Sequence, residues 1–325
     1  MIKIGVIGAG HLGKIHIRLL KEIPDFFLVG FFDPDPAKSL EIQTQFEIPA
    51  FPDAESLISL CDAIDIVTPT LYHHFYAVSG LKKSKHVFIE KPVTATLEEG
   101  KELLALEKEA KVKVQIGHVE RFNPAFLALE GQELKPMFIE CHRLAQWNPR
   151  GTDVSVVLDL MIHDLDLIQS VVKSPVKKVS ASGVAVLSDT PDIANARIEF
   201  NNGCVANLTT SRISMKNMRK IRFFQPNGYV SVDFLDKKTE LYLIEDPAAP
   251  DPKWEDSMKI PFGSEGHLKN LVIIEPPIPE VNAIRMELET FAAAIREEIP
   301  VRVSLSDGVN ALETAMTVLD KIQGR

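Results

Sequence analysis

The sequence has 325 residues, a length typical of two domains of about 150 residues each. Apolar residues account for 45% and charged residues for 25%, which indicates a globular protein with a sizeable core and excludes disorder as its main state. The 45 acidic residues outnumber the 36 lysines and arginines, so the net charge is −9. An acidic chain of this kind is a poor partner for nucleic acids and for anionic membranes.

The three cysteines, Cys61, Cys141 and Cys204, are widely spaced and form no CxxC pair. This pattern indicates a reducing compartment and argues against both a disulfide framework and a structural zinc site. The apolar N-terminus is short and leads directly into glycines, unlike a signal peptide, and no apolar run approaches the roughly 18 residues of a membrane span. We therefore expect a cytoplasmic protein.

In the first 120 residues, short apolar strands alternate with segments of helical periodicity. Continuously apolar strands between helices predict a parallel sheet that helices cover on both faces. The expected strands are residues 2–7, 27–32, 63–67, 86–90 and 113–117, and the expected helices are residues 11–22, 53–60, 73–83 and 96–111, the last of which opens with a capping box.

The pattern changes near residues 122–124, beyond which the strands are longer and alternate between apolar and polar residues. At 195–200 the alternation is clear, and an Asn-Asn-Gly turn follows at 201–203. Such half-buried strands and tight turns predict an antiparallel sheet. A helix at about 154–172 interrupts the strands, and two helices close the chain.

A glycine-rich loop, Gly8-Ala9-Gly10-His11-Leu12-Gly13, lies between the first strand and the first helix. Gly8 permits a tight turn, Gly10 lets the backbone approach a pyrophosphate, and Gly13 permits close packing of helix on strand. The helix N-terminus offers unpaired N–H groups to the phosphates. The loop predicts a doubly wound, Rossmann-type α/β domain at residues 1–122 that binds a dinucleotide. The change of pattern predicts a second, α+β domain at 123–325, and we expect its last helix to pack back on the first domain.

Asp33 ends the second strand, 20 residues after Gly13, where an acidic residue is expected to bind the adenosine ribose. A carboxylate there accepts hydrogen bonds from a 2′-hydroxyl and repels a 2′-phosphate. The nearest cation is Lys38, and no arginine neighbours Asp33, so the sequence predicts NAD rather than NADP. The alternative is a glycine turn and a solvent-facing aspartate in a fold that binds no cofactor.

Three further segments complete a recognisable pattern: Thr-Pro-Thr-Leu-Tyr-His at 68–73, Glu-Lys-Pro at 90–92 and Asp-Leu-Met-Ile-His at 159–163. With the glycine loop and in this order, they resemble the Gfo/Idh/MocA oxidoreductases, a family that includes glucose–fructose oxidoreductase and inositol dehydrogenase. The resemblance extends over essentially the whole chain. Ser84 departs from the pattern, since the family often has glycine there, but it lies at a helix end away from the chemistry.

The resemblance implies that substrate binds between an NAD-binding domain and an open-faced, mainly antiparallel sheet, and that dimers or tetramers form through this sheet. It assigns the nicotinamide side of the cofactor site to four residues and the catalytic group to three. The cofactor-side residues are Thr68, Pro69, His73 and Glu90, and the catalytic residues are Lys91, Asp159 and His163.

These residue types suit the oxidation of an alcohol, in which a proton leaves oxygen as hydride leaves carbon. His163 has the intrinsic pKa of a general base at neutral pH. Asp159 lies four residues earlier, on the same face of a helix, and would orient the imidazole. Lys91 ends a parallel strand and would stabilise alkoxide character on the reacting oxygen. NAD carries the hydride, so no metal is required.

Each assignment has a structural alternative. Asp159 and His163 could stabilise their helix or lie in a core, and Lys91 could be an ordinary lysine at a strand end. The basic segment 215–222 is expected to be a solvated face rather than a phosphate site. Trp147 and Arg150 could either grip a sugar or nucleotide or brace a loop. Five further histidines are expected to be structural or surface residues: His11, His16, His74, His86 and His118.

Residues 117–125 and 157–164 are similar to segments of UDP-N-acetylglucosamine 3-dehydrogenases and related nucleotide-sugar oxidoreductases. This similarity implies oxidation of the sugar 3-hydroxyl to a ketone by NAD. Arg121 and Asn123 could contact that substrate or tie the two domains together. The alternatives are a dehydrogenase of a free polyol or sugar such as inositol, and a non-catalytic NAD-dependent sensor on the same fold.

Overall fold

The computed structural model describes residues 1–148, 154–264 and 267–324. The chain divides into two compact units, each built from two segments: Met1–Val119 with Asn282–Glu313, and Glu120–Val281 with Thr314–Arg325. The two units are described separately below. Among the described helices, none combines the length and the apolar character that a membrane span requires.

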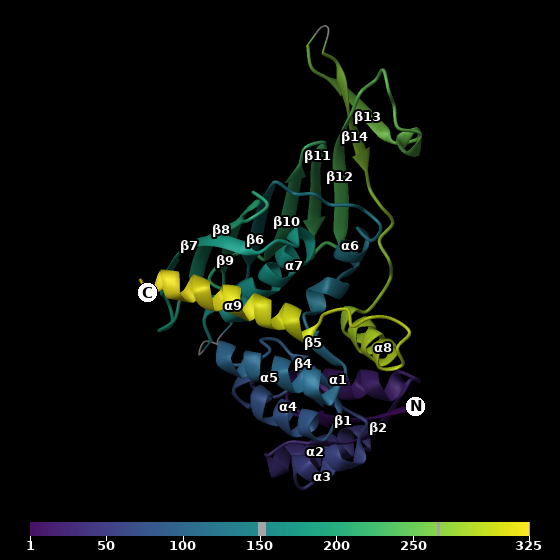
Figure 1. Ribbon diagram of the computed structural model, residues 1–325, viewed down its shortest axis with the longest axis vertical. Helices are drawn as coiled ribbons and strands as arrows, with labels where there is room; N and C mark the ends of the chain where they lie inside the picture. The colour runs from purple at the N-terminus through teal and green to yellow at the C-terminus, as the bar shows by residue number, and fades with distance from the viewer. Residues whose placement is uncertain (149–153, 265–266, 325) are drawn as a thin grey trace. The chain divides into compact units, whose positions relative to one another are not determined.

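The first unit is built on a five-stranded parallel sheet with the strand order β2-β1-β3-β4-β5. Apolar side chains dominate these strands and are buried on both faces, because helices lie on either side of the sheet (Figure 1). The covered parallel sheet predicted from the sequence is therefore confirmed. The strands are β1 (Ile2–Ile7), β2 (Phe26–Phe32), β3 (Ala63–Ile66), β4 (His86–Glu90) and β5 (Val114–Gly117).

The helices of the first unit form two groups around this sheet. One group contacts β1 and β2 through α1, and the other contacts β3 and β4 through α4. Their bounds are α1 (His11–Glu22), α2 (Pro36–Phe46), α3 (Ala54–Leu60), α4 (His73–Lys82), α5 (Leu97–Ala110) and α8 (Ala283–Ile295). At the start of α5, Thr96 accepts a hydrogen bond from the Glu99 backbone and Glu99 accepts one from the Thr96 backbone, which is the predicted capping box.

Helix α8 returns from the second half of the chain to complete the core of the first unit. Its Leu288 and Phe291 are fully buried and cluster with Ile17 of α1 and Phe88 of β4. The Phe88 and Phe291 rings meet edge to face with their centroids 5.9 Å apart. The division of the chain therefore differs from the expected boundary after residue 122, since the first unit ends at Val119 and regains residues 282–313.

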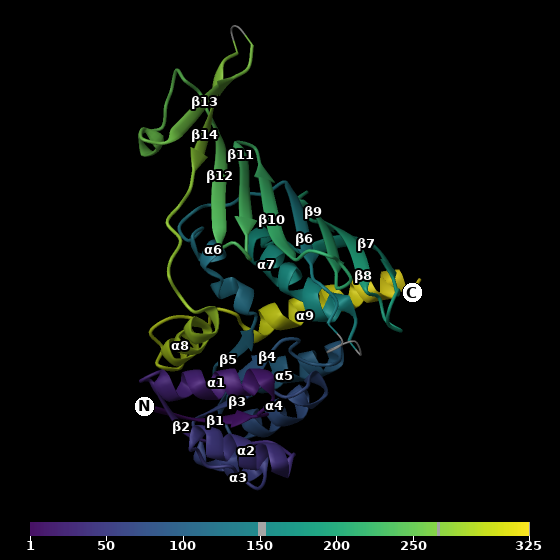
Figure 2. The same cartoon turned by 180° about the vertical axis from the view of Figure 1, so that it is seen from behind.

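The second unit carries a nine-stranded sheet with the order β13-β14-β12-β11-β10-β6-β9-β8-β7. All neighbouring strands are antiparallel except β6 and β9, which confirms the predicted, mainly antiparallel sheet. Figure 2 shows the strands fanning out from β7 to β12, with β13 and β14 extending beyond the others. The strands are β6 (Phe138–Leu144), β7 (Val176–Val184), β8 (Ile193–Phe200), β9 (Val205–Ser211), β10 (Met218–Gln225), β11 (Gly228–Asp233), β12 (Lys238–Glu245), β13 (Met258–Phe262) and β14 (Lys269–Ile274).

Burial alternates along these strands, because one face of the sheet packs on the core. On β8, Ala196, Ile198 and Phe200 are buried and their neighbours point outward, as the sequence predicts. The helices of this unit are short apart from α7 and the end of α9, which begins in the first unit. The helical segments are η2 (Val119–Phe122), α6 (Pro124–Leu127), η3 (Val157–Met161), α7 (Ile162–Val172), η4 (Pro252–Trp254) and α9 (Leu305–Ile322).

Candidate functional site

The glycine loop lies between the end of β1 and the start of α1. Gly8 has φ +98°, and a Cβ there would lie 2.8 Å from the backbone of Val67. A Cβ on Gly13 would lie 2.1 Å from the Gly8 carbonyl oxygen, so only glycine lets the helix approach the loop this closely. Gly10 faces open space, with nothing within 4 Å of a Cβ built there. The loop thus has the tight turn, the close packing and the open backbone that a pyrophosphate requires.

Asp33 lies directly after β2 and beside the glycine loop. Its Oδ2 accepts a hydrogen bond of 2.8 Å from the Ala9 backbone, and its Oδ1 accepts one of 3.0 Å from the Asp35 backbone. The Lys38 ammonium lies 3.3 Å from Oδ1 and partly screens the carboxylate. These contacts fix Asp33 at the end of β2, where the sequence places the ribose-binding carboxylate.

His73 joins two loops at the carboxyl edge of the sheet. Its Nδ1 lies 2.8 Å from the Pro92 carbonyl oxygen and its Nε2 lies 2.8 Å from the Thr68 carbonyl oxygen. Burial lowers the pKa of His73 below its usual value, although the two carbonyl groups act in the other direction. His73 therefore braces the backbone around Thr68 and Pro69, on one side, against Pro92 on the other. This bracing role is one that the sequence did not assign to it.

Glu90 and Lys91 lie at the carboxyl end of β4, where open α/β sheets bind ligands. The Glu90 Oε2 accepts a hydrogen bond of 3.2 Å from the Lys91 backbone. The side chain of Lys91 is half-buried, and its peptide bond to Pro92 is cis. The structure thus gathers the glycine loop, Asp33, Thr68, His73, Glu90 and Lys91 in one unit.

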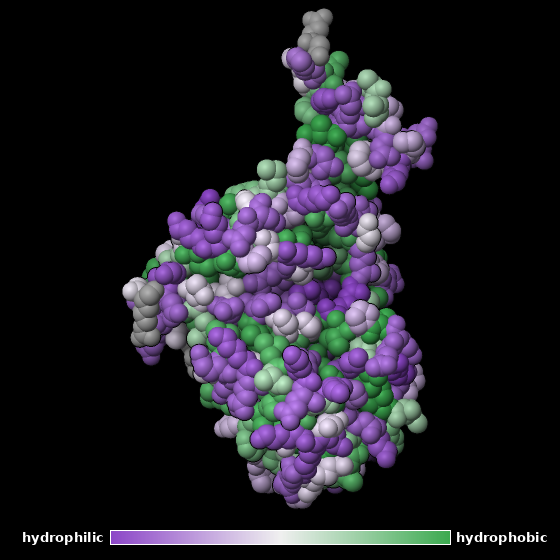
Figure 3. Space-filling model, in the orientation of Figure 1, coloured by the Kyte–Doolittle hydropathy of each residue, from purple (hydrophilic) through white to green (hydrophobic). Residues whose placement is uncertain are grey.

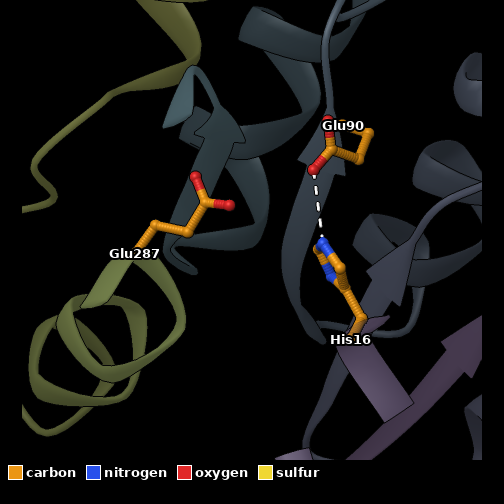
Figure 4. A group of neighbouring side chains, drawn as sticks. All are labelled: His16, Glu90 and Glu287. Carbon is orange, nitrogen blue, oxygen red and sulfur yellow. Dashed lines mark ion pairs between the residues drawn. The ribbon is translucent and has the colours of Figure 1, made fainter. Parts of the chain in front are cut away.

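A buried group of charged side chains adjoins this end of β4, and the sequence analysis missed it. We call it the His16 cluster; its members are His16 of α1, Asp65 of β3, Glu90 of β4 and Glu287 of α8. His16 Nδ1 lies 2.9 Å from Asp65 Oδ2, and His16 Nε2 lies 3.4 Å from Glu90 Oε1. Figure 4 shows the Glu287 carboxyl group pointing toward the His16 and Glu90 pair.

A weak signal for this cluster was present in the sequence. His16 and Glu287 each lie among the apolar residues of an amphipathic helix, on the face that packs on the core. A charged residue in such a stripe needs a partner that is equally buried. The sequence alone cannot identify that partner, because His16 and Glu287 are far apart in the chain.

Asp159 and His163 belong to the second unit and are both half-buried. The expected α-helix from residue 154 begins instead with a π-helical turn at Val157–Met161, and α7 follows from Ile162. Asp159 lies inside the wider π turn, so its angular relation to His163 is not the one that an α-helix gives. Single π turns of this kind are frequent at functional sites.

The structure places the four predicted substrate-contact residues in different surroundings. Arg121 makes a bidentate ion pair with Asp166, at 2.6 and 2.8 Å. Asn123 caps α6 and donates to Glu120 and to the Phe234 carbonyl group. Trp147 remains 39% exposed, and Arg150 lies outside the described residues. Arg121 and Asn123 thus organise the second unit itself.

The basic segment 215–222 lies at the start of β10, and three of its cations, Arg219, Lys220 and Arg222, lie beside carboxylates of neighbouring elements. Arg222 pairs with Glu140 and Lys220 pairs with Asp233, both within 2.8 Å. Arg219 lies 3.6 Å from Glu120. These pairs support the interpretation as a solvated sheet face, because an anion would have to compete with existing carboxylates.

Three features of the first unit fit the dinucleotide that the motif implies. Gly10 leaves its surroundings open, and α1 begins without a side-chain cap, so its first N–H groups can reach a phosphate. The Thr68 hydroxyl is buried and has no hydrogen-bond partner among the described residues. Donors and acceptors of this kind match the phosphates and the carboxamide of NAD.

Comparison with known proteins agrees with this geometry. Residues 2–118 match the model of an oxidoreductase family with an NAD-binding Rossmann fold, GFO/IDH/MocA. Residues 131–230 match the model of the C-terminal domain of the same family. Both halves of the chain therefore carry the signature of one enzyme family, in the order that the sequence motifs predict.

Individual proteins that resemble this chain are dehydrogenases. A UDP-N-acetylglucosamine 3-dehydrogenase of Acidithiobacillus ferrooxidans is 38% identical over 242 residues, which cover 74% of this chain and 77% of the relative. A solved structure of that organism's UDP-N-acetylglucosamine 3-dehydrogenase GnnA matches with a TM-score of 0.87 at 32% identity, covering 99% of this chain and 98% of the other. A scyllo-inositol 2-dehydrogenase of Bacillus subtilis is 27% identical over 66% of this chain and 68% of its own length. The chain therefore belongs to the Gfo/Idh/MocA family of oxidoreductases with an NAD-binding Rossmann fold.

Proposed function

We propose that the protein oxidises the 3-hydroxyl of a nucleotide sugar such as UDP-N-acetylglucosamine to a ketone, with NAD as the oxidant. The observation that carries this proposal is the similarity to the UDP-N-acetylglucosamine 3-dehydrogenase of A. ferrooxidans, which extends over three quarters of both chains. The intact set of Lys91, Asp159 and His163 supports catalysis rather than sensing, because a sensor needs no proton acceptor.

The reaction divides between cofactor and side chains. NAD, held by the glycine loop and Asp33, would supply the acceptor for the hydride that leaves the carbinol carbon. His163 accepts the hydroxyl proton, and Asp159 orients its imidazole and stabilises the resulting cation. The Lys91 ammonium stabilises negative charge on the sugar oxygen as the proton leaves. The C–H bond and the O–H bond break, a C=O bond forms, and the two electrons leave with the hydride.

A single-turnover assay tests this function. Purified protein is mixed with NAD and with one member of a panel of UDP-sugars and free polyols, and NADH absorbance is followed. We expect NADH with UDP-N-acetylglucosamine or a close relative of it. NADH with a free polyol alone would replace the proposal by an inositol-type dehydrogenase. Confirmed NAD binding without NADH from any substrate would contradict catalysis.

We also propose that the protein is a cytoplasmic homodimer or homotetramer that associates through the nine-stranded sheet. Free, buried cysteines support a reducing compartment. The outer face of the sheet carries stacked aromatic rings, and the ring centroids of Tyr229 and Tyr242 lie 4.5 Å apart. Figure 3 shows apolar side chains along the projecting β13 and β14, where Met258, Ile260 and Phe262 are exposed. Light scattering coupled to gel filtration tests this, and a monomer at micromolar concentration would contradict it.

A further inference from the structure

The His16 cluster contains more acid than base. Its three carboxyl groups, Asp65, Glu90 and Glu287, face a single imidazole, and Asp65, Glu287 and His16 are each 0% exposed. One ligand atom each from His16, Glu90 and Glu287 lies within 4.8 Å of the other two. If all four groups were ionised, the cluster would hold a net charge of −2 in a space that excludes water, which is strongly unfavourable.

A proton on one carboxyl group reduces this net charge from −2 to −1 and also supplies a hydrogen-bond donor. Asp65 already accepts from His16 at 2.9 Å. Glu90 faces His16 at 3.4 Å and accepts from the Lys91 backbone at 3.2 Å. The two carboxyl oxygens of Glu287 are buried and accept no hydrogen bond from the described part of the chain. Glu287 is therefore the group that an added proton stabilises most.

The electrostatic environment agrees. Burial raises the pKa of Glu287 well above its usual value, and the charge on Glu90 raises it further. The His16 cation acts against this shift, and Asp65 reinforces it. Burial alone would lower the pKa of His16, but Asp65 and Glu90 outweigh it, so the His16 pKa lies well above its usual value. These directions, together with the unpartnered oxygens of Glu287, favour a neutral Glu287 beside a cationic His16.

A metal ion is the other way to balance these charges. One histidine and two carboxylates suit a divalent cation, and the contact of His16 with Asp65 resembles the outer-sphere support of a zinc ligand. A closed structural site takes four protein ligands, however, whereas the described residues offer three here. A proton satisfies the cluster without a missing ligand, so the geometry favours the proton.

Glu90 connects this cluster to the cofactor end of the sheet. A Cβ on Gly117 would lie 2.7 Å from Glu90 Oε1, so the carboxyl group rests directly on β5. On one side it receives the Lys91 N–H group, and on the other it meets His16. A donor from Glu287 would complete the set of contacts that fix the Glu90 side chain next to Lys91.

We propose that Glu287 is a positioning residue: a neutral carboxylic acid that donates its proton within the His16 cluster and fixes Glu90, and through it Lys91, for NAD binding. Helix α8 thereby supplies a group from the far end of the sequence to the cofactor site of the first unit. The inference rests on the proposed function insofar as it assigns Glu90 and Lys91 to the nicotinamide side.

Two variants and a control test the proposal. Glu287→Gln keeps a neutral donor of the same size, Glu287→Leu removes the donor at similar volume, and Glu289→Gln changes the half-exposed neighbour that pairs with Arg285. Isotope-edited infrared difference spectra report protonated carboxyl groups directly. We expect the wild-type protein and Glu289→Gln to show a protonated-carboxyl band that both Glu287 variants lack.

Calorimetric titration with NAD provides the functional readout. We expect Glu287→Gln to stay within about threefold of the wild-type Kd, and Glu287→Leu to bind about tenfold more weakly, since one hydrogen bond to a charged group is lost. Glutamine at position 287 should therefore keep the NAD affinity that leucine lowers. A role of Glu287 in packing alone does not predict this difference. Should Glu287→Leu fail to fold, the infrared band and Glu287→Gln still decide.

Three results would overturn the proposal: no band that depends on Glu287, equal loss of NAD affinity in both variants, or one equivalent of bound metal in protein purified without chelator. None of these readouts involves a sugar. If the wild-type protein binds NAD but oxidises no substrate, the proposed function fails while the infrared and binding results still decide the role of Glu287.

Discussion

His16 Nδ1 lies 2.9 Å from Asp65 Oδ2 although neither side chain reaches the surface. The two residues come from α1 and β3, so this contact joins the helix that follows the glycine loop to the centre of the sheet. Burial disfavours charge on both groups and raises the pKa of Asp65, but each partner stabilises the charge of the other. The pair therefore couples the stability of the first unit to pH.

Asp65→Asn should destabilise the protein by about 3–5 kcal/mol, because it leaves the His16 cation without its main partner. Because the pKa of His16 is higher in the folded protein than in the unfolded chain, the charged imidazole stabilises the fold. This stabilisation is complete below the unfolded-state pKa of about 6.5 and is lost as the pH rises through the folded-state pKa. The cost of Asp65→Asn should accordingly be larger at about pH 6 than at about pH 8.5. Urea unfolding at both pH values measures this, and a cost independent of pH would contradict a cationic His16.

Alanine at Gly10 should weaken NAD binding, whereas alanine at Gly13 should lower the stability of the fold. Gly10→Ala meets open space and should leave the free energy of unfolding within about 0.5 kcal/mol, while weakening NAD binding at least about tenfold because the methyl group occupies the pyrophosphate position. Gly13→Ala meets the Gly8 carbonyl oxygen and should destabilise the fold by about 1–3 kcal/mol. Thermal unfolding and NAD titration of both variants separate the two effects. Unchanged NAD affinity in Gly10→Ala would argue against this loop as the phosphate site.

The elements around the glycine loop were predictable because their signals are local. Apolar strands, the Gly8–Gly13 spacing and the Thr96 capping box all depend on residues within one or two turns of each other. The alternation of β8 likewise predicted its buried face. These signals gave the parallel sheet of the first unit and the antiparallel sheet of the second.

Features that depend on distant residues were missed. The partners of His16 become clear only when α8 packs beside Phe88. Arg121 carried no local sign that Asp166 would take its guanidinium group. The π turn at Asp159 has no periodicity of its own, since one wider turn does not change the apolar pattern around it. Long-range pairing, rather than local propensity, decided each of these cases.

Asp33→Ser should shift the preference between the two nicotinamide cofactors. Removing the carboxylate removes its repulsion of a 2′-phosphate, and Lys38, now 3.3 Å from Asp33 Oδ1, becomes available to that phosphate. We expect the ratio of kcat/KM for NAD to that for NADP to fall at least about tenfold. Asp35→Asn, which keeps an N-cap at α2, is the matched control and should preserve the ratio. An unchanged ratio in Asp33→Ser would place the adenosine ribose elsewhere.

Lys91→Ala and His163→Ala test the assigned chemistry directly. Each removes a group to which we assign a role in the transition state, so we expect kcat to fall by about 10²–10⁴-fold. Lys101→Ala removes an exposed lysine of α5 and should leave turnover unchanged. NAD affinity, measured by the same titration, should stay near the wild-type value for His163→Ala, because His163 belongs to the second unit and its proposed role is to accept the proton of the sugar hydroxyl. Full turnover in His163→Ala would exclude His163 as the proton acceptor. Full turnover in Lys91→Ala would exclude Lys91 as the group that stabilises charge on the sugar oxygen.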